Sequence, residues 1–272
     1  MTTARIGMVN FINTAPLYVI WQQRVKRTDW QVVEGAPSTL NRMLCNNELD
    51  LGFVSSHEYG ANPHLYRVLD GLSISATGPV GSVFLFSGIA PQELSGRLVG
   101  LSAQSQTSNA LVKIILEEFL GVTPCYAINK DNGNRHDVVA QLAIGDEALR
   151  LQQQGDFPFC LDLSHVWQQH TGLPFVFAVW AVRDDFFRRH EQTVHEIRRE
   201  LLFCIEEGKK VLPAVCRQVA PRIPMDVESC RRYLSGIEYD LSPRKLLALE
   251  LFFDYLIRRG ELPAAALPVS LV

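Results

Sequence analysis

The 272-residue sequence lacks the features that mark several common classes of protein. Its six cysteines form no CxxC pair and its histidines form no HExxH word, so neither a disulfide framework nor a zinc site is expected. The longest apolar run, residues 173–182, contains a proline and is too short to span a bilayer. With 26 basic and 29 acidic residues, a net charge of -3 gives no electrostatic case for nucleic-acid binding.

The same absences indicate where the protein works. The first residues run directly into a predicted strand, so we expect no signal peptide. Scattered cysteines are typical of free thiols in a reducing compartment, and the expected location is the cytoplasm. The expected partner is a small-molecule substrate, with no nucleic acid and no membrane, and the chain is expected to be a monomer or a homodimer.

Predicted strands alternate with predicted helices along the chain, which indicates an α/β protein. The expected strands are 5–9, 30–34, 51–54, 69–74, 82–87, 98–101, 124–128, 141–144, 158–162 and 175–182. The expected helices are 15–25, 37–46, a short one after residue 56, 108–120, 136–142, one around 194–205 and one from Ser242 onward, with a loop at 131–134.

The chain is expected to form two lobes. Residues 90–96 are a turn-rich connection, and the apolar strand 175–182 could carry the chain back to the first lobe. We therefore predict a discontinuous first lobe of residues 1–87 plus 183–272 and a second lobe of residues 92–178. Two lobes joined by two crossings make a hinged cleft that can close on a small ligand.

Three strand-to-helix junctions are rich in Asn, Ser and Thr: residues 10–16, 54–59 and 102–109. Such residues are good helix N-caps, and capping alone explains any one junction about as well as a site does. Helix N-termini also bind carboxylates and phosphates. Three such junctions together favour a site for a small anion, built from neutral donors because none of them contains Lys or Arg.

Several words of sequence, in their order and spacing, carry a resemblance to a known family. They are NTAPL at 13–17, LDLGFVSSHEY at 49–59, SISA at 73–76, GPVGSV at 78–83, IGDEAL at 144–149 and the stretch from Trp167 through TGLPFVFAVWA at 171–181. The chain resembles the menaquinone-biosynthesis enzymes of the futalosine pathway, most closely the chorismate dehydratase family. The C-terminal part, about 190–272, is much less diagnostic.

The resemblance implies a periplasmic-binding-protein-like fold of type II. It implies conversion of chorismate to 3-[(1-carboxyvinyl)oxy]benzoate with loss of water, and it implies no cofactor and no metal. We expect substrate-binding roles for Ser55, Ser56, Ser82, Ser105, Thr107 and Ser108, and catalytic roles for Asn13 and Asp146. No histidine is an obvious base, so the proton could equally pass to the substrate's own side-chain carboxylate.

Simpler roles stay open for several of these residues. Asn13 could form an Asx turn before Pro16, and Ser82 could be an ordinary strand-end serine. Asp146 could contact the substrate hydroxyl or act as an N-cap for the helix that follows.

Other functions are also open. The fold would suit a transporter's solute-binding protein, although no secretion signal is expected, or a LysR-type effector domain, although no helix-turn-helix precedes the first strand. The sister enzyme, 1,4-dihydroxy-6-naphthoate synthase, resembles an enzyme with a histidine base in an Ile-His-Glu word. This chain has Gly145 at the histidine position, which favours the dehydratase.

Overall fold

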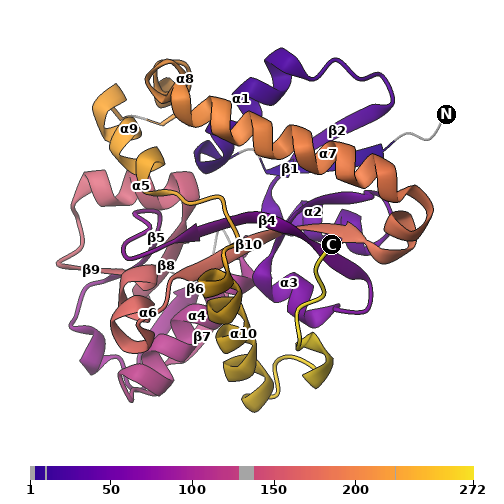
Figure 1. Ribbon diagram of the computed structural model, residues 1–272. Coiled ribbons are helices and arrows are strands. Elements are labelled where there is room, and N and C mark those ends of the chain that lie inside the picture. Colours follow the sequence, from indigo (N-terminus) through magenta and orange to yellow (C-terminus); the bar gives the residue numbers. More distant parts are fainter. Residues whose placement is uncertain (1–3, 10, 129–137, 224) are drawn as a thin grey trace.

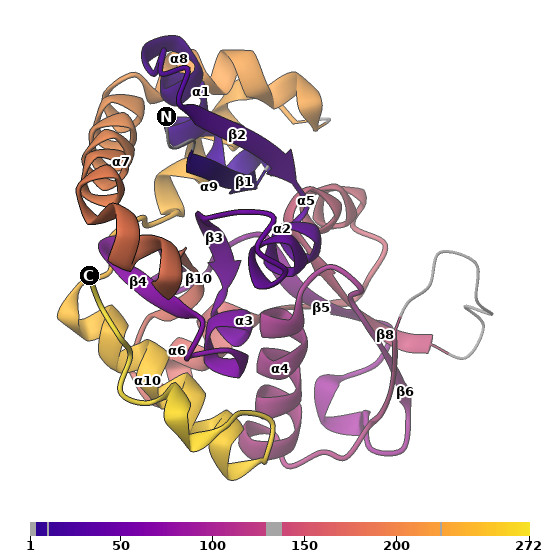
Figure 2. The same cartoon turned by 90° about the vertical axis from the view of Figure 1, so that its right-hand side faces the viewer.

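The computed structural model describes residues 4–9, 11–128, 138–223 and 225–272. Asn10, in the first predicted junction, and the predicted loop 131–134 lie outside the described residues. The chain forms two five-stranded sheets with helices packed around them, so the predicted α/β class is confirmed (Figures 1 and 2).

The first sheet has the strand order β2-β1-β3-β10-β4. Its strands are β1 (Ala4–Val9), β2 (Trp30–Gly35), β3 (Leu51–Ser55), β4 (Tyr66–Ala76) and β10 (Phe175–Arg183). Strand β1 is parallel to β2 and β3, whereas β10 is antiparallel to both β3 and β4. Strand β3 is buried at all five positions, as expected for a central strand covered on both faces.

The second sheet repeats this plan in the order β7-β6-β8-β5-β9. Its strands are β5 (Val83–Ser87), β6 (Leu98–Leu101), β7 (Cys125–Ile128), β8 (Val138–Ile144) and β9 (Phe159–Asp162). Strand β6 is parallel to β7 and β8, and β5 is antiparallel to β8 and β9.

Sheet membership changes at two crossings of the chain, residues 77–82 and 163–174. Residues 83–87, which the sequence assigned to the first lobe, form a strand of the second sheet. Strand β10 begins at Phe175, inside the range assigned to the second lobe, yet it lies in the first sheet. The division into rigid lobes stays a prediction, with its crossings at these two segments.

Ten α-helices surround the sheets in the described part of the chain. They are α1 (Ala15–Arg24), α2 (Pro37–Cys45), α3 (Ser56–Ala61), α4 (Gln106–Ile114), α5 (Gly145–Gln154), α6 (Leu163–Thr171), α7 (Asp184–Lys210), α8 (Leu212–Val219), α9 (Val227–Gly236) and α10 (Pro243–Arg258). Helix α7 packs against α1 and runs along one face of the first sheet (Figure 1). Rings of α10 pack onto Trp167 of α6, which buries apolar surface between the C-terminal segment and the second sheet's helices.

Two predicted elements differ from the structure. Helix 136–142 is wrong over its described part, because residues from Val138 onward belong to strand β8. Its paired valines fit a pleated surface, and the pairing with β5 and β6 decides the conformation. Helix 108–120 is confirmed in position, but it begins at Gln106 and changes after Ile114 into a π-helical turn, residues 115–119.

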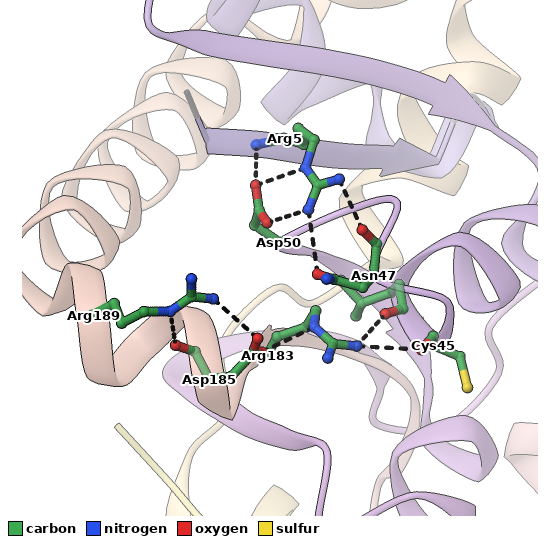
Figure 3. Close-up of polar contacts among 8 residues, drawn as sticks. Arg5, Cys45, Asn47, Asp50, Arg183, Asp185 and Arg189 are labelled. Carbon is green, nitrogen blue, oxygen red and sulfur yellow. Dashed lines mark hydrogen bonds and ion pairs between the residues drawn. The ribbon is translucent and has the colours of Figure 1, made fainter. Parts of the chain in front are cut away.

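The second residue of the word at 49–59, Asp50, has a structural role, because its carboxylate joins two strands of the first sheet through Arg5. Asp50, only 4% exposed, accepts hydrogen bonds from the Arg5 backbone N–H at 2.7 Å and from its guanidinium at 2.6 and 3.1 Å (Figure 3). Arg183, at the end of β10, donates to the carbonyl groups of Leu44 and Cys45 at the end of α2 (Figure 3). These contacts fix the ends of β1, β3 and β10, and they lie apart from the pocket described next.

Candidate functional site

A pocket lies where elements of the two sheets meet, with about 640 Å³ of atom-free space including its open mouth. One side is lined by β3 and by Phe11 and Asn13 of the segment that follows β1. The other side is lined by the start of β5, the start of α4 and the β8–α5 junction. The complete set of lining residues is Val9, Phe11, Asn13, Pro37, Phe53, Val54, Ser55, Ile74, Val80, Ser82, Val83, Ser105, Ser108, Ile144, Gly145, Phe177 and Ala178.

The pocket sits at the carboxyl ends of parallel strands. Strands β1 and β3 of the first sheet, and β6 and β8 of the second, each lead from their C-terminal end into a helical segment beside it. In open α/β sheets this is where ligands bind, because successive helix N-termini converge there. The predicted junctions therefore meet, together with a fourth junction between β8 and α5.

Ser55 is the N-cap of α3 and contributes a hydroxyl to the pocket. Its Oγ accepts from the Glu58 N–H at 3.2 Å and from Asn41 Nδ2 at 3.1 Å. A hydroxyl has two acceptor positions and one proton. Because both acceptor positions are occupied, the Ser55 O–H is left as a donor for a ligand. Asn41, 7% exposed, fixes the residue further by accepting from its backbone N–H.

The start of α4 supplies a second donor from the opposite side. Ser105 is the N-cap, and its Oγ accepts from the Ser108 N–H at 3.1 Å while donating to Ser108 Oγ at 3.0 Å. This bond occupies an acceptor position of Ser108, whose own proton can then point into the pocket. The partial positive charge of the helix N-terminus favours an anion at the same place.

Asn13 and Ser82 bring two more neutral groups. The side-chain oxygen of Asn13 is buried and has no hydrogen-bond partner in the described structure, so this amide is available to a ligand. Ser82, at the beginning of β5, is 3% exposed and accepts at Oγ from the Tyr233 hydroxyl at 3.0 Å.

Gly145 is required by the backbone and by its neighbour. Its φ is +56°, a left-handed conformation, and its N–H donates to the Ser82 carbonyl at 2.7 Å. A Cβ at this position would meet Phe11 Cδ2 at 3.1 Å. The space beside Gly145 is therefore taken by the Phe11 ring, which itself lines the pocket.

Three of the eight predicted site residues do not line the pocket. Ser56 donates to the Val176 carbonyl at 2.7 Å, and Thr107 Oγ1 accepts from the His57 N–H at 2.9 Å. Asp146 accepts from the Ile12 N–H at 3.3 Å, and it is the second residue of α5, whose N-cap is Ile144. Asp146 is therefore not the N-cap.

Two of these contacts join the sheets. Thr107 and Asp146 belong to helices of the second sheet, and they accept backbone N–H groups from segments that follow strands of the first. Each is a sequence neighbour of a pocket residue: Thr107 of Ser108, and Asp146 of Gly145. We interpret them as bridging contacts that hold elements of the two sheets together beside the pocket.

No described residue that lines the pocket carries a formal charge. His57, the histidine nearest in sequence, does not line it. Burial lowers the pKa of His57, and its Nδ1 is buried without a partner in the described structure. The arrangement can therefore present hydrogen-bond donors to an anion and one unpaired amide oxygen to a hydroxyl group, in an apolar setting that strengthens each bond. Among all the residues that the structure describes, no cluster of His, Cys, Asp and Glu could hold a metal ion, and no helix is long and apolar enough to cross a membrane.

The sequence analysis missed the apolar walls of the pocket and the residues behind it. Phe11 stands inside the first predicted junction and Phe177 inside the word at 171–181, so their place in those segments was the available signal. Tyr233 and Tyr239 gave no signal, because each reaches the site over more than 150 residues of chain.

Comparison with known proteins adds a family and a fold. The sequence pattern of the menaquinone biosynthesis family matches residues 4–258. The chain is 31% identical over 270 residues to the chorismate dehydratase of Thermus thermophilus, covering 92% of this chain and 94% of that protein. It is 24% identical over 252 residues to the chorismate dehydratase of Campylobacter jejuni, covering 90% and 94%.

Among solved structures, the chain is similar to the Candida albicans CA3427 gene product, which exhibits the generic periplasmic binding protein structural fold. The TM-score is 0.73 at 12% sequence identity, covering 100% of this chain and 96% of that chain. This likeness concerns the fold, and it confirms the predicted periplasmic-binding-protein-like architecture.

Proposed function

The chain belongs to the menaquinone biosynthesis family, and on this premise we propose that it is a chorismate dehydratase, a carbon–oxygen lyase that releases water from chorismate. The product is 3-[(1-carboxyvinyl)oxy]benzoate. The observation that carries the proposal is the full-length similarity to two chorismate dehydratases, together with a pocket of neutral donors where sequence reasoning expected one. The family's biosynthetic role supports a cytoplasmic location.

The reaction asks little of the protein beyond placement and charge stabilisation. Chorismate loses a ring proton from the carbon that bears the ether oxygen and a hydroxyl from the next carbon, and the ring becomes aromatic. Conjugation with the ring carboxylate acidifies that proton, so negative charge grows on the carboxylate in the transition state. Preorganised donors that meet this growing charge lower the barrier.

We assign the donors by their position in the pocket. The Ser55 and Ser108 hydroxyls and the N-terminus of α4 face the pocket from two sides, and they suit the carboxylates of the substrate. The Asn13 amide suits the leaving hydroxyl, which is the group that most needs a defined orientation. Ser82 lies beside Gly145 and completes the polar set. The apolar walls, including Phe11 and Phe177, suit the carbocyclic ring.

The proton acceptor follows from what the pocket lacks. None of the described lining residues is a carboxylate, histidine or lysine. We therefore propose that the enolpyruvyl carboxylate of chorismate takes the ring proton and gives it to the leaving hydroxyl, which departs as water, with the protein holding the side chain over the ring. Gly145 has no side chain that could act as a base, which separates this site from one that works through a histidine there.

The test is direct turnover. Purified protein is incubated with chorismate and with the cyclic de-hypoxanthine futalosine derivative in parallel, and products are followed by mass spectrometry. We expect loss of one water from chorismate and no reaction of the futalosine derivative. The opposite result would show the sister activity, and binding of chorismate without turnover would show a solute-binding protein.

The variants for this assay are Asn13→Ala and Ser55→Ala, with Ser235→Ala as the matched control because Ser235 is an exposed serine of α9. One hydrogen bond to a charged group is worth roughly 1.5–3 kcal/mol, so the Ser55 variant should lose about ten- to a hundredfold in kcat/KM. The control should keep wild-type kinetics. Wild-type turnover in both pocket variants would contradict the assignment of the site.

A further inference from the structure

The C-terminal segment reaches back to the pocket through two tyrosine hydroxyls. Tyr239, which is 2% exposed, donates to the Asn13 carbonyl at 2.7 Å. Tyr233, on α9, donates to Ser82 Oγ at 3.0 Å. The two acceptors are pocket residues on opposite sides of the cavity, one following β1 and the other opening β5.

The backbone that carries Tyr239 is itself fixed to the first sheet. Ser73 N–H donates to the Tyr239 carbonyl at 2.8 Å, and Ser75 exchanges backbone hydrogen bonds with Glu238, each at 2.9 Å. The segment between α9 and α10 thus lies along the edge of β4 (Figure 1). These bonds fix the backbone from which the tyrosine hydroxyl reaches Asn13.

Tyr233 is placed by packing against the first crossing. A Cβ on Gly81 would lie 3.6 Å from Tyr233 Cδ2, so the ring rests on the residue just before Ser82. The hydroxyl bond then occupies an acceptor position of Ser82 and leaves the serine proton for the pocket. Chained hydroxyls also polarise one another, which strengthens the last donor.

We propose that Tyr233 and Tyr239 are positioning residues of the site: Tyr233 sets the direction of the Ser82 hydroxyl, and Tyr239 fixes the Asn13 backbone so that its amide faces the pocket. This inference rests on the proposed function for its kinetic consequences. Neither tyrosine lines the pocket, so each acts through its partner and not through the substrate.

The protonation state of both groups suits this role at every physiological pH. Burial raises the pKa of Tyr233 and of Tyr239 well above that of a free phenol. The hydroxyl protons therefore stay in place, and both groups remain donors.

The kinetic test uses Tyr233→Phe and Tyr239→Phe, which keep the ring and remove the hydroxyl. The matched control is Tyr66→Phe, because the Tyr66 hydroxyl is buried and donates to Glu58 Oε1 at 3.0 Å, and neither of these two residues lines the pocket. We expect kcat/KM for chorismate to fall about 3- to 10-fold in each site variant, the range of one neutral hydrogen bond, and to stay unchanged in the control.

A double-mutant cycle separates positioning from general structure. If Tyr233 acts through Ser82, then Tyr233→Phe should change kcat/KM less than twofold in a Ser82→Ala background. Full additivity of the two losses would overturn the proposal for Tyr233. The corresponding cycle pairs Tyr239→Phe with Asn13→Ala and is judged in the same way.

A second readout does not depend on turnover. In substrate-free protein, the side-chain amide resonance of Asn13 should move in Tyr239→Phe, and the Cβ resonance of Ser82 should move in Tyr233→Phe, while Tyr66→Phe moves neither. If the wild type fails to convert chorismate, the proposed function fails, and these resonances still decide the positioning roles. Resonances that stay in place in both variants would refute them.

Discussion

Replacing Thr107 by valine tests whether this residue binds substrate or bridges the two sheets beside the pocket. Sequence reasoning expected Thr107 to bind a carboxylate, whereas the structure places its Oγ1 on the His57 N–H at 2.9 Å. Valine has nearly the same shape but accepts no hydrogen bond, so the His57 N–H loses its partner. Such an unpaired buried donor costs about 1–3 kcal/mol.

The expected result has two parts. The substrate-free protein should melt at a lower temperature, by roughly 2–4 °C for each kcal/mol at this chain length. If the arrangement of the two sheets around the pocket is weakened by the same free energy, KM for chorismate rises by at most about 5- to 150-fold, while kcat at saturation changes little. Thr107→Ser is the matched control, because serine keeps the acceptor and should restore both values.

The measurements are thermal unfolding of the substrate-free variants and steady-state kinetics with chorismate. A valine variant that melts like the wild type, yet loses activity strongly, would refute the bridging role of Thr107. The side chain would then contact the substrate directly, and the first expectation would hold.

Three further predictions concern the fold and its pH response. Asp50→Asn should lower the free energy of unfolding by about 1–3 kcal/mol, because the partly exposed Arg5 guanidinium loses a buried charged partner. Asp185→Asn should change it by less than about 1 kcal/mol, because the Asp185 carboxylate, which pairs with Arg183 and Arg189, is itself half-exposed. Urea unfolding that ranks the two variants equally would contradict this. Gly145→Ala should lower the free energy of unfolding by about 1–2 kcal/mol, because alanine disfavours the positive φ of this position. It should also lower kcat/KM, because the new Cβ meets the Phe11 ring. Unchanged stability and unchanged kcat/KM would show that the turn relaxes freely. The folded-state pKa of His57 lies below its unfolded value of 6.5, so its contribution to stability is full above pH 6.5 and is lost as the pH falls toward the folded pKa. His57→Gln should therefore flatten the acid part of the curve of unfolding free energy against pH. Identical curves for the variant and the wild type would rule out this contribution of His57.

Much of the fold could be read from local pattern. Strands such as 98–101 and helices such as 37–46 appear at or within one residue of their predicted limits, because apolar periodicity and the proline at position 37 are local signals. Residues 138–142 were misjudged as helix. Their conformation depends on pairing with β5 and β6, which lie about 40 to 55 residues earlier in the chain.

The site divides in the same way. The sequence by itself determined that hydroxyl and amide residues stand at strand-to-helix junctions, since N-capping and strand ends are properties of a few consecutive residues. It therefore led to Asn13, Ser55, Ser105 and Ser108 at the pocket. It could not distinguish Ser55 from Ser56, which differ by one residue but face different partners.

Only the tertiary structure decided which hydroxyls are free for a ligand. Thr107 accepts from a backbone group of another element and Ser56 donates to one, and neither lines the pocket. Tyr233 and Tyr239 arrive from the far end of the chain. A side chain's availability depends on every neighbour that can donate to it or accept from it. Those neighbours are brought together by the burial of two sheets and their helices, a long-range event that no short word of sequence records.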